Sequence, residues 1–149
     1  MMSHKIELAT PQDTEAIIQF QLAMASETEG ITLDYETVRE GVKAAIADDS
    51  KALYLLAKNE EDQVIGSLML TTEWSDWNNG VYYWIQSVYV RPDDRKQGVF
   101  SELFELAKSI AQSQNAGALR LYVDEHNLVA QKVYQSLGMH PSHYLMYEL

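Results

Sequence analysis

Cysteine is absent from the 149 residues of this chain. Its absence excludes disulfide bonds, thiolate metal sites and a cysteine nucleophile, and it is compatible with a reducing cytosol. Positive charge is also scarce, since 11 Lys and Arg residues stand against 22 Asp and Glu residues, for a net charge of −11 with His neutral. A nucleic-acid-binding surface needs a broad basic face, so we expect no nucleic-acid partner. An acidic surface instead attracts cations.

Long apolar runs are missing as well. No stretch approaches the roughly 20 apolar residues of a membrane-spanning helix. Residues 1–5 lead into a strand-like segment without the apolar core of a signal peptide. We therefore expect a cytoplasmic protein with no membrane partner. The hydrophobic content of 46% is that of a globular protein, and no linker or repeat interrupts the chain, so we expect one domain over residues 1–149.

Hydrophobic periodicity predicts the order β-α-α-β-β-β-α-β-α-β. Thr10 and Asp34 are suited to cap the first two helices. Short polar turns in the middle of the chain favour an antiparallel meander, and the segment from Val81 to Val90 is apolar on both faces, like a central strand. The expected fold class is a mixed α/β sandwich of three layers. After the first strand, the predicted elements are helices near 11–28 and 34–46, strands at 52–57, 64–72 and 81–90, a helix from about Ser101, a strand at 118–123, a helix at 128–137 and a terminal strand at 144–148.

The segment from Ser87 to Ser101 is the most informative part of the chain. A β-branched run ends at Pro92, a short charged loop with one glycine follows, and an amphipathic helix begins. This order puts free backbone N–H groups and a helix N-terminus at the carboxyl end of a buried strand, where both favour a phosphate or pyrophosphate. Arg91, Arg95 and Lys96 concentrate positive charge there. An ordinary strand-to-helix turn with solvated charges is the alternative.

Three segments resemble the GNAT superfamily of N-acetyltransferases. Arg95 to Phe100 resembles the family's Q/R-x-x-G-x-G/A loop, Asn127 to Met139 resembles its N-x-x-A-x-x-x-Y-x-x-x-G-F signature, and Ile6 to Asp13 resembles its first strand and turn. Together they span nearly the whole chain. The resemblance implies the GNAT fold, with a mixed, mostly antiparallel central sheet flanked by helices. One residue departs from the loop pattern, because Phe100 stands where the family carries Gly or Ala.

The resemblance implies that acetyl-coenzyme A (acetyl-CoA) binds as the acetyl donor. In the family, the loop holds the pyrophosphate, and the preceding strand binds the pantetheine arm with its backbone. Spacing places Phe100 on the apolar stripe of the following helix, so we expect it to pack inward. We expect Ser101 to cap that helix, with contact to phosphate as the alternative. The implied cofactor-binding residues are Val88, Tyr89, Val90, Arg95, Lys96, Gln97, Gly98, Val99, Phe100, Ser101, Asn127 and Tyr134.

Tyr134 corresponds to the family's general acid. Acetyl transfer from a thioester expels a thiolate whose parent thiol has a pKa near ~8.5, whereas a tyrosine with a pKa near ~10 is protonated at neutral pH. The tyrosine hydroxyl can therefore donate a proton to the departing sulfur. Asn127 lies two helical turns earlier and shares its helix face. A packing role is the alternative for this tyrosine.

The base and the acceptor pocket are less well defined. Gln86 lies on the strand where many family members carry a carboxylate, and it cannot act as a base. Glu73 is expected as the catalytic base, with Asp76 as a second candidate, acting through water. The surrounding loop predicts an aromatic and anionic cradle for an ammonium group. A hairpin tip with both tryptophans packed on the sheet is the alternative. The expected acceptor-binding residues are Glu29, Trp74, Asp76, Trp77 and Gln86, with Glu27 beside Glu29 at the end of the first helix.

The leading hypothesis is an acetyl-CoA-dependent N-acetyltransferase that transfers acetyl directly to a primary amine of a small, cationic acceptor. One alternative is a non-catalytic acyl-CoA-binding regulatory module. Another is a nucleotide-phosphate-binding domain, which is disfavoured because the G-x-x-x-x-G-K-[ST] motif is missing. The 4 His residues have no metal-ligand spacing, so no metal is expected. The identity of the acceptor and the formation of a homodimer stay open.

Overall fold

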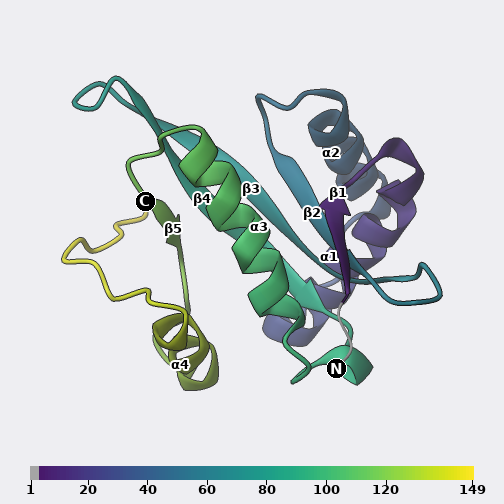
Figure 1. Ribbon diagram of the computed structural model, residues 1–149. Helices are drawn as coiled ribbons and strands as arrows, with labels where there is room; N and C mark the ends of the chain where they lie inside the picture. The colour runs from purple at the N-terminus through teal and green to yellow at the C-terminus, as the bar shows by residue number, and fades with distance from the viewer. Residues whose placement is uncertain (1–3) are drawn as a thin grey trace.

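The computed structural model describes residues 4–149 and contains one five-stranded sheet with helices on both faces (Figure 1). The expected absence of a signal peptide also concerns residues 1–3, which lie outside the described residues. None of the helices in the described part of the chain is long and apolar enough to cross a membrane. The elements in chain order are β1 (Lys5–Leu8), the 3-10 turn η1 (Pro11–Asp13), α1 (Thr14–Glu29), α2 (Tyr35–Ala47), β2 (Leu53–Lys58), β3 (Val64–Ser75), β4 (Gly80–Val90), the 3-10 turn η2 (Pro92–Asp94), α3 (Val99–Ser113), β5 (Leu119–Leu121) and α4 (Leu128–Ser136).

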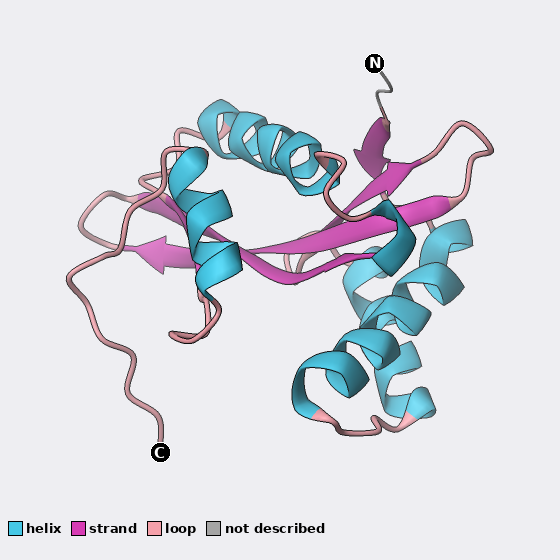
Figure 2. Ribbon diagram, turned by 90° about the horizontal axis from the view of Figure 1, so that it is seen from below, coloured by secondary structure: helices cyan, strands magenta, loops and turns pink. Residues whose placement is uncertain are grey.

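The strands follow the order β1-β2-β3-β4-β5 across the sheet. The first four are antiparallel neighbours, whereas β5 runs parallel to β4. α3 packs on one face of the sheet, and α1 and α2 pack on the other (Figure 2). One buried cluster joins α3 to the sheet, and a second joins α1 and α2 to β2. The predicted three-layer α/β sandwich with a mostly antiparallel sheet is confirmed.

Local sequence explains where two of the helices begin. Asp34 caps α2 as predicted, because its side chain accepts a hydrogen bond from the Thr37 backbone nitrogen at 3.0 Å. α3 begins at Val99, and its N-cap is Gly98, whose φ of 79° lies in the left-handed region. Ser101 is therefore the third residue of the helix. The prediction that Ser101 caps this helix is wrong.

The predicted terminal strand at 144–148 is also wrong. Residues 140–149 form no helix or strand, and every one of them is exposed. A strand needs a neighbour for its backbone hydrogen bonds, and β5, the nearest strand in the sequence, is short. Only Tyr83 to Ile85 of β4 pair with it, so β5 spans Leu119–Leu121 instead of the predicted 118–123. The strand-like pattern at 144–148 thus has no partner strand within residues 4–149.

β3 and α3 approach each other closely at Gly66. A Cβ atom at this position would lie 3.0 Å from Val99 Cγ1 and 3.3 Å from the Tyr89 carbonyl oxygen. Val99 is buried in the first turn of α3. Gly66 pairs with Val90 at the end of β4. Because Gly66 has no side chain, the N-terminus of α3 can pack close to this end of the sheet.

We expect Gly66→Ala to lower the free energy of unfolding by about 1–3 kcal/mol, the usual cost of overpacking. Gly41→Ala is the matched control, because a Cβ atom in the middle of α2 meets no atom within 4 Å. That change should raise stability by about 0.5–1 kcal/mol, since alanine is the better helix former. Urea unfolding curves of both variants provide the comparison. An unchanged midpoint for Gly66→Ala would contradict the close packing.

Candidate active site

β4 carries a β-bulge near its end. Ser67 pairs with Tyr89 and Met69 pairs with Gln86, so β4 has one more residue than β3 between these pairs. The extra residue is accommodated at Ser87, whose φ of 53° lies in the left-handed region and costs about 1–3 kcal/mol for a residue with a side chain. Cross-strand partners share a face of the sheet. Gln86 and Tyr89 therefore both lie on the face that α1 covers.

β4 and β5 separate just before the bulge. Their pairing ends with Ile85 and Leu121, and β5 itself ends there. Beyond this point, no described strand pairs with the β5 side of β4. The backbone from Val88 to Val90 is thus unpaired on that side. This is the stretch for which the family resemblance implies binding of an extended ligand through the backbone.

The loop after β4 leads directly into the N-terminus of α3. Lys96 and Gly98 both have positive φ, at 63° and 79°. Among residues 4–149, no hydrogen-bond acceptor is recorded for the backbone N–H groups from Lys96 to Ser101. A Cβ atom at Gly98 would meet nothing within 4 Å, so the space in front of it is open. Gln97 is exposed, and its Nε2 donates to the Asp93 carbonyl oxygen at 3.2 Å. Free donors and the helix dipole make this loop suited to an anion.

Arg95 turns away from the loop towards the end of α1. Its Nε donates to the Val90 carbonyl oxygen at 2.8 Å, and its Nη2 lies 3.0 Å from Glu27 Oε2. The Tyr89 hydroxyl donates to the other Glu27 oxygen at 3.1 Å, and burial together with this hydrogen bond raises the pKa of Tyr89. Glu29 makes no recorded hydrogen bond or ion pair among the described residues. Of the two acids at the end of α1, the structure therefore brings Glu27 to the loop.

Phe100 packs inward, as its spacing predicts. It is partly buried against the core, and its ring centre lies 6.1 Å from that of Phe104 and 5.5 Å from that of Tyr134. The second contact is edge-on and joins the start of α3 to α4. Asn127 caps α4, because its side chain accepts a hydrogen bond from the Ala130 backbone nitrogen at 3.1 Å. Burial raises the pKa of Tyr134 above the ordinary value, so this phenol is protonated at neutral pH.

A second cluster lies where β3, β4 and β5 meet. Glu73 Oε1 accepts a hydrogen bond from Trp84 Nε1 at 2.8 Å and lies 3.6 Å from Arg120 Nη1. The Trp84 ring stacks on the Tyr122 ring with a centre-to-centre distance of 4.7 Å. The Arg120 guanidinium carbon lies 4.0 Å from the centre of the Tyr82 ring. These residues form an aromatic platform with one acidic residue, Glu73, and one basic residue, Arg120, at its edge.

Sequence reasoning identified Glu73 but missed the residues around it. Arg120 reaches Trp84 through the parallel pairing of β4 with β5, which no sequence motif marks. The signal that was available is a basic residue inside a predicted strand, where a long charged side chain needs an aromatic or acidic partner. Gln86, the other polar residue predicted here, donates from Nε2 to Thr71 Oγ1 at 2.7 Å. The neighbouring strand therefore takes one donor of this amide.

Trp74, Asp76 and Trp77 lie apart from this cluster. Trp74 directly follows Glu73 on β3, so the two side chains point to opposite faces of the sheet. The Trp74 and Trp77 side chains are 63% and 94% exposed, and Asp76 is exposed in the hairpin turn. The structure therefore does not bring Trp74 or Trp77 together with Glu73, and it leaves most of both side chains exposed.

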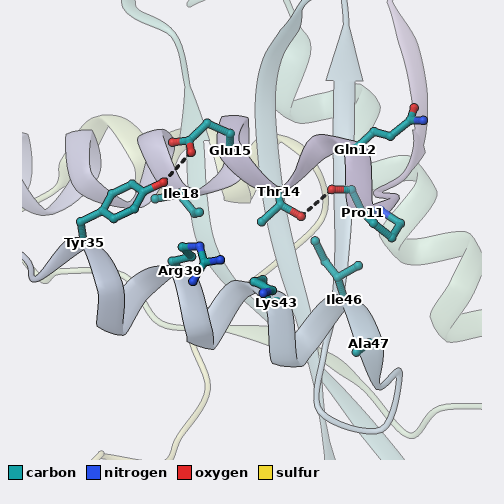
Figure 3. Close-up of a pocket in the computed structure, with 10 residues that line it drawn as sticks. All are labelled: Pro11, Gln12, Thr14, Glu15, Ile18, Tyr35, Arg39, Lys43, Ile46 and Ala47. Atoms are coloured by element: carbon teal, nitrogen blue, oxygen red, sulfur yellow. Dashed lines mark hydrogen bonds between the residues drawn. The ribbon is translucent and has the colours of Figure 1, made fainter.

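A groove of about 530 Å³ lies elsewhere, between α1 and α2 (Figure 3). Glu15 accepts a hydrogen bond from the Tyr35 hydroxyl at 2.5 Å there, and Arg39 and Lys43 line the same groove. None of the predicted site residues lies in it. Along α1, Glu15 is separated by about 18 Å of helix from Glu27, at about 1.5 Å per residue. Within residues 4–149, no three His, Asp or Glu side chains are grouped to hold a metal ion.

Comparison with known proteins adds to this geometry. A profile of the Acetyltransferase (GNAT) family matches residues 15–139, which include the loop and α4. Among solved structures, a protein described as a "possible acetyltransferase" from Clostridium difficile 630 is 39% identical and has a TM-score of 0.90, with 100% of this chain and 97% of that chain covered. None of the curated proteins matches the sequence.

Two further solved structures show the fold at lower identity. A protein described as a "probable acetyltransferase" is 24% identical with a TM-score of 0.87, and 97% of this chain and 96% of that chain are covered. The ribosomal-protein-alanine N-acetyltransferase from Brucella melitensis biovar Abortus 2308 is 14% identical with a TM-score of 0.78. In this comparison, 99% of this chain and 98% of that chain are covered.

Proposed function

The chain belongs to the acetyltransferase (GNAT) family, and from this membership we propose that it transfers an acetyl group from acetyl-CoA to a primary amine of a small acceptor. One observation carries the proposal. Within the described residues, the N–H groups that begin α3 have no recorded acceptor, and they lie next to the edge of β4 that no strand pairs with. Acetyl-CoA combines a pyrophosphate with an extended, amide-containing arm. The helix start suits the pyrophosphate, and the free strand edge suits the arm.

The residues that would hold acetyl-CoA come from one continuous stretch. The backbone from Lys96 to Ser101 offers the donors, with Gly98 leaving the approach open. The backbone from Val88 to Val90 offers peptide groups to the arm, apart from the Val90 carbonyl oxygen, which accepts a hydrogen bond from Arg95 Nε. Phe100 contributes its N–H while its ring packs against the core. Arg95 has a positioning role here, because it is bonded to Glu27 and to the carboxyl end of β4.

Tyr134 is the proposed general acid. Acetyl-CoA supplies the thioester carbonyl that a neutral amine attacks, and the thiolate leaves as the carbon–sulfur bond breaks. The Tyr134 hydroxyl makes no recorded hydrogen bond among the described residues, and its raised pKa keeps its proton available at neutral pH. Contact with Phe100 ties the phenol to the start of α3. Donation to the leaving sulfur is the role that fits these properties.

Glu73 is the proposed acid that recruits the amine. An alkylammonium has a pKa near ~10.4, so it must lose a proton before it attacks. A carboxylate can attract the cation and accept that proton through a water molecule. Trp84 and Tyr122 offer a flat aromatic surface for the apolar part of the acceptor, and a ring face also attracts an ammonium group. The proposal gives no part to Trp77, which is exposed at the hairpin tip.

A non-catalytic acyl-CoA-binding module is the second candidate. One observation favours it: Glu73 is already engaged by Trp84 and Arg120, which leaves it less free to act as a base. Both functions predict cofactor binding, so turnover separates them. A panel of polyamines, amino sugars, amino acids and peptide N-termini, assayed for release of free thiol, distinguishes the two. Turnover with any amine supports the enzyme, and binding without turnover across the panel supports the module.

Gly98→Glu is expected to weaken acetyl-CoA binding by at least tenfold, because a carboxylate would occupy the space in front of the α3 N-terminus. Gly30→Glu is the matched control. Gly30 also has a positive φ and open space around it, but it ends α1. Titration calorimetry measures both affinities, and circular dichroism confirms that both variants fold. Equal affinity for the two variants would exclude this loop as the cofactor site.

Tyr134→Phe is expected to reduce kcat by about 10²–10⁴-fold, the usual contribution of an acid catalyst, with little change in acetyl-CoA affinity. The raised pKa gives the sign of the pH effect: the wild-type rate should persist through the pH range in which a free tyrosine ionises, and it should fall only above that range, as the buried phenol ionises. Tyr35→Phe on α2 is the control and should retain full turnover. A Tyr134→Phe variant as fast as wild type would exclude Tyr134 as the acid.

Glu73→Gln is expected to raise the KM for a cationic amine by about tenfold, because it removes the carboxylate charge while keeping an acceptor for Trp84. Asp76→Asn is the control, since it removes one charge from the exposed hairpin turn nearby. Added salt should weaken amine binding to the wild type and affect Glu73→Gln less. Equal KM values for the wild type and Glu73→Gln would place the acceptor elsewhere.

A further inference from the structure

Arg120 lies close to the point where β4 and β5 separate. It pairs with Trp84, and the pairing of the two strands ends at the next pair, Ile85 and Leu121. Cross-strand partners share a face of the sheet, so Arg120 and Trp84 lie on the same face as Gln86. Among the described residues, the buried cluster on that face contains no residue of β4 or β5. Arg120 therefore borders the region where the acceptor is proposed to bind.

Aromatic rings set the position of the Arg120 guanidinium group. Its carbon lies 4.0 Å from the centre of the Tyr82 ring and 5.8 Å from the centre of the Trp84 ring. The Tyr82 ring is itself held in place. Its hydroxyl accepts a hydrogen bond from Asn78 Nδ2 at 2.9 Å, and a Cβ atom on Gly117 would lie only 2.5 Å from its Cε1. The arginine is therefore held in position by its own chain, without a ligand.

One edge of this guanidinium group has no partner in the described part of the chain. The ion pair recorded for Arg120 joins Nη1 to Glu73 Oε1 at 3.6 Å, which is longer than a hydrogen bond. No acceptor is recorded for Nε or Nη2 within residues 4–149. The side chain is 34% exposed, so a ligand can reach this edge. Two parallel N–H groups match the two oxygens of a carboxylate.

Glu73 supplies the opposite charge beside this edge. Its Oε1 accepts from Trp84 Nε1 and faces Arg120, whereas no partner is recorded for its Oε2 among the described side chains. A free acceptor and a free pair of donors thus lie next to each other. A simple alkylamine would satisfy the carboxylate and leave the arginine edge unpaired. A molecule with an ammonium and a carboxylate group on one carbon atom satisfies both.

Given the proposed function, on which this step rests, we propose that Arg120 binds a carboxylate of the acceptor and that the acceptor is an α-amino acid with an apolar side chain. The ammonium group lies at Glu73 Oε2, and the carboxylate lies at the Nε–Nη2 edge of Arg120. The apolar side chain lies on Trp84 and Tyr122, whose rings stack with a centre-to-centre distance of 4.7 Å. Arg120 thereby selects among primary amines.

The charges of the substrate and product agree with this acceptor. A net charge of −11 repels a simple carboxylate, but a zwitterion has no net charge to repel. Acetyl transfer forms a carbon–nitrogen bond and breaks the carbon–sulfur bond of the thioester. The nitrogen loses two protons: one replaces the proton that Tyr134 gives to the thiolate, and the other passes through Glu73 to solvent. The product keeps its carboxylate and has lost its positive charge, so Glu73 repels it and favours its release.

Paired acceptors test the carboxylate contact. L-Leucine and 3-methylbutylamine differ only in the carboxylate, as do L-phenylalanine and 2-phenylethylamine. With the wild type, kcat/KM should be about tenfold or more higher for the amino acid of each pair, because two charge-assisted hydrogen bonds are added. Arg120→Gln should lower kcat/KM for the amino acid by about tenfold more than for the amine. Arg120→Lys keeps the charge without the paired N–H groups, and it should retain only part of the preference.

Lys108→Gln is the matched control. It removes one positive charge from an exposed position on α3, which packs on the other face of the sheet. The preference for the amino acid should stay as in the wild type. Equal kcat/KM values for both members of each pair with the wild type would overturn the inference and leave the proposed acetyl transfer standing. Equal losses for both members in Arg120→Gln would also overturn it, because an arginine that only supports the fold affects both alike.

Binding without turnover separates this inference from the proposed function. The chain has 3 Trp residues, so Trp74→Phe/Trp77→Phe leaves Trp84 as the one fluorescent tryptophan, directly on the platform. With coenzyme A in place of acetyl-CoA, L-leucine or L-phenylalanine should change this fluorescence to saturation. Adding Arg120→Gln should raise the Kd by about tenfold or more. Saturable binding without turnover of any amine would refute the acetyl transfer and retain the carboxylate site. No saturable change with either amino acid, or an unchanged Kd in Arg120→Gln, would refute the site.

Discussion

The β-bulge at Ser87 is the constraint on which the site depends. In a regular strand, Gln86 and Tyr89 would point to opposite faces, because they are three residues apart. The extra residue puts both on the α1 face. There Tyr89 reaches Glu27, and Gln86 reaches Thr71. The pairing of β4 with β5 also ends just before the bulge. In the described residues, the peptide groups of β4 on that side therefore have no partner strand from the bulge onwards.

Two arginines organise the acids of an otherwise acidic chain. Arg95 holds Glu27 beside the loop, and Arg120 holds Glu73 beside the aromatic platform. Each guanidinium group also lies against the face of a tyrosine ring. These contacts hold each carboxylate in one orientation, whereas an acid on the surface that contacts only water would be free to rotate. The two pairs lie on either side of the point where β4 and β5 separate.

Apart from the fold class, which the order of elements and the family resemblance both indicated, the features that sequence reasoning predicted correctly are local ones. The cap at Asp34, the strand-loop-helix around Gly98 and the inward packing of Phe100 each depend on residues within a few positions of one another. The prediction of a terminal strand at 144–148 was wrong because a strand needs a partner strand, and periodicity does not specify where that partner is. Arg120 was missed, because parallel pairing brings it to the site from a distant part of the chain. Glu27 was named for the acceptor pocket, but its contacts with Arg95 and Tyr89 depend on how α1 docks on the sheet.

The contact between Gly66 and Val99 has a consequence for how long the protein lasts in a cell. It places the first turn of α3 against β3, so the N–H groups that begin α3 are held together only in the folded chain. A ligand that binds the folded form alone stabilises it by about 2.7 kcal/mol at a hundred times its Kd. With acetyl-CoA as that ligand, scarcity of the cofactor would enlarge the unfolded fraction available to proteases. The abundance of the protein would then follow the acetyl-CoA supply.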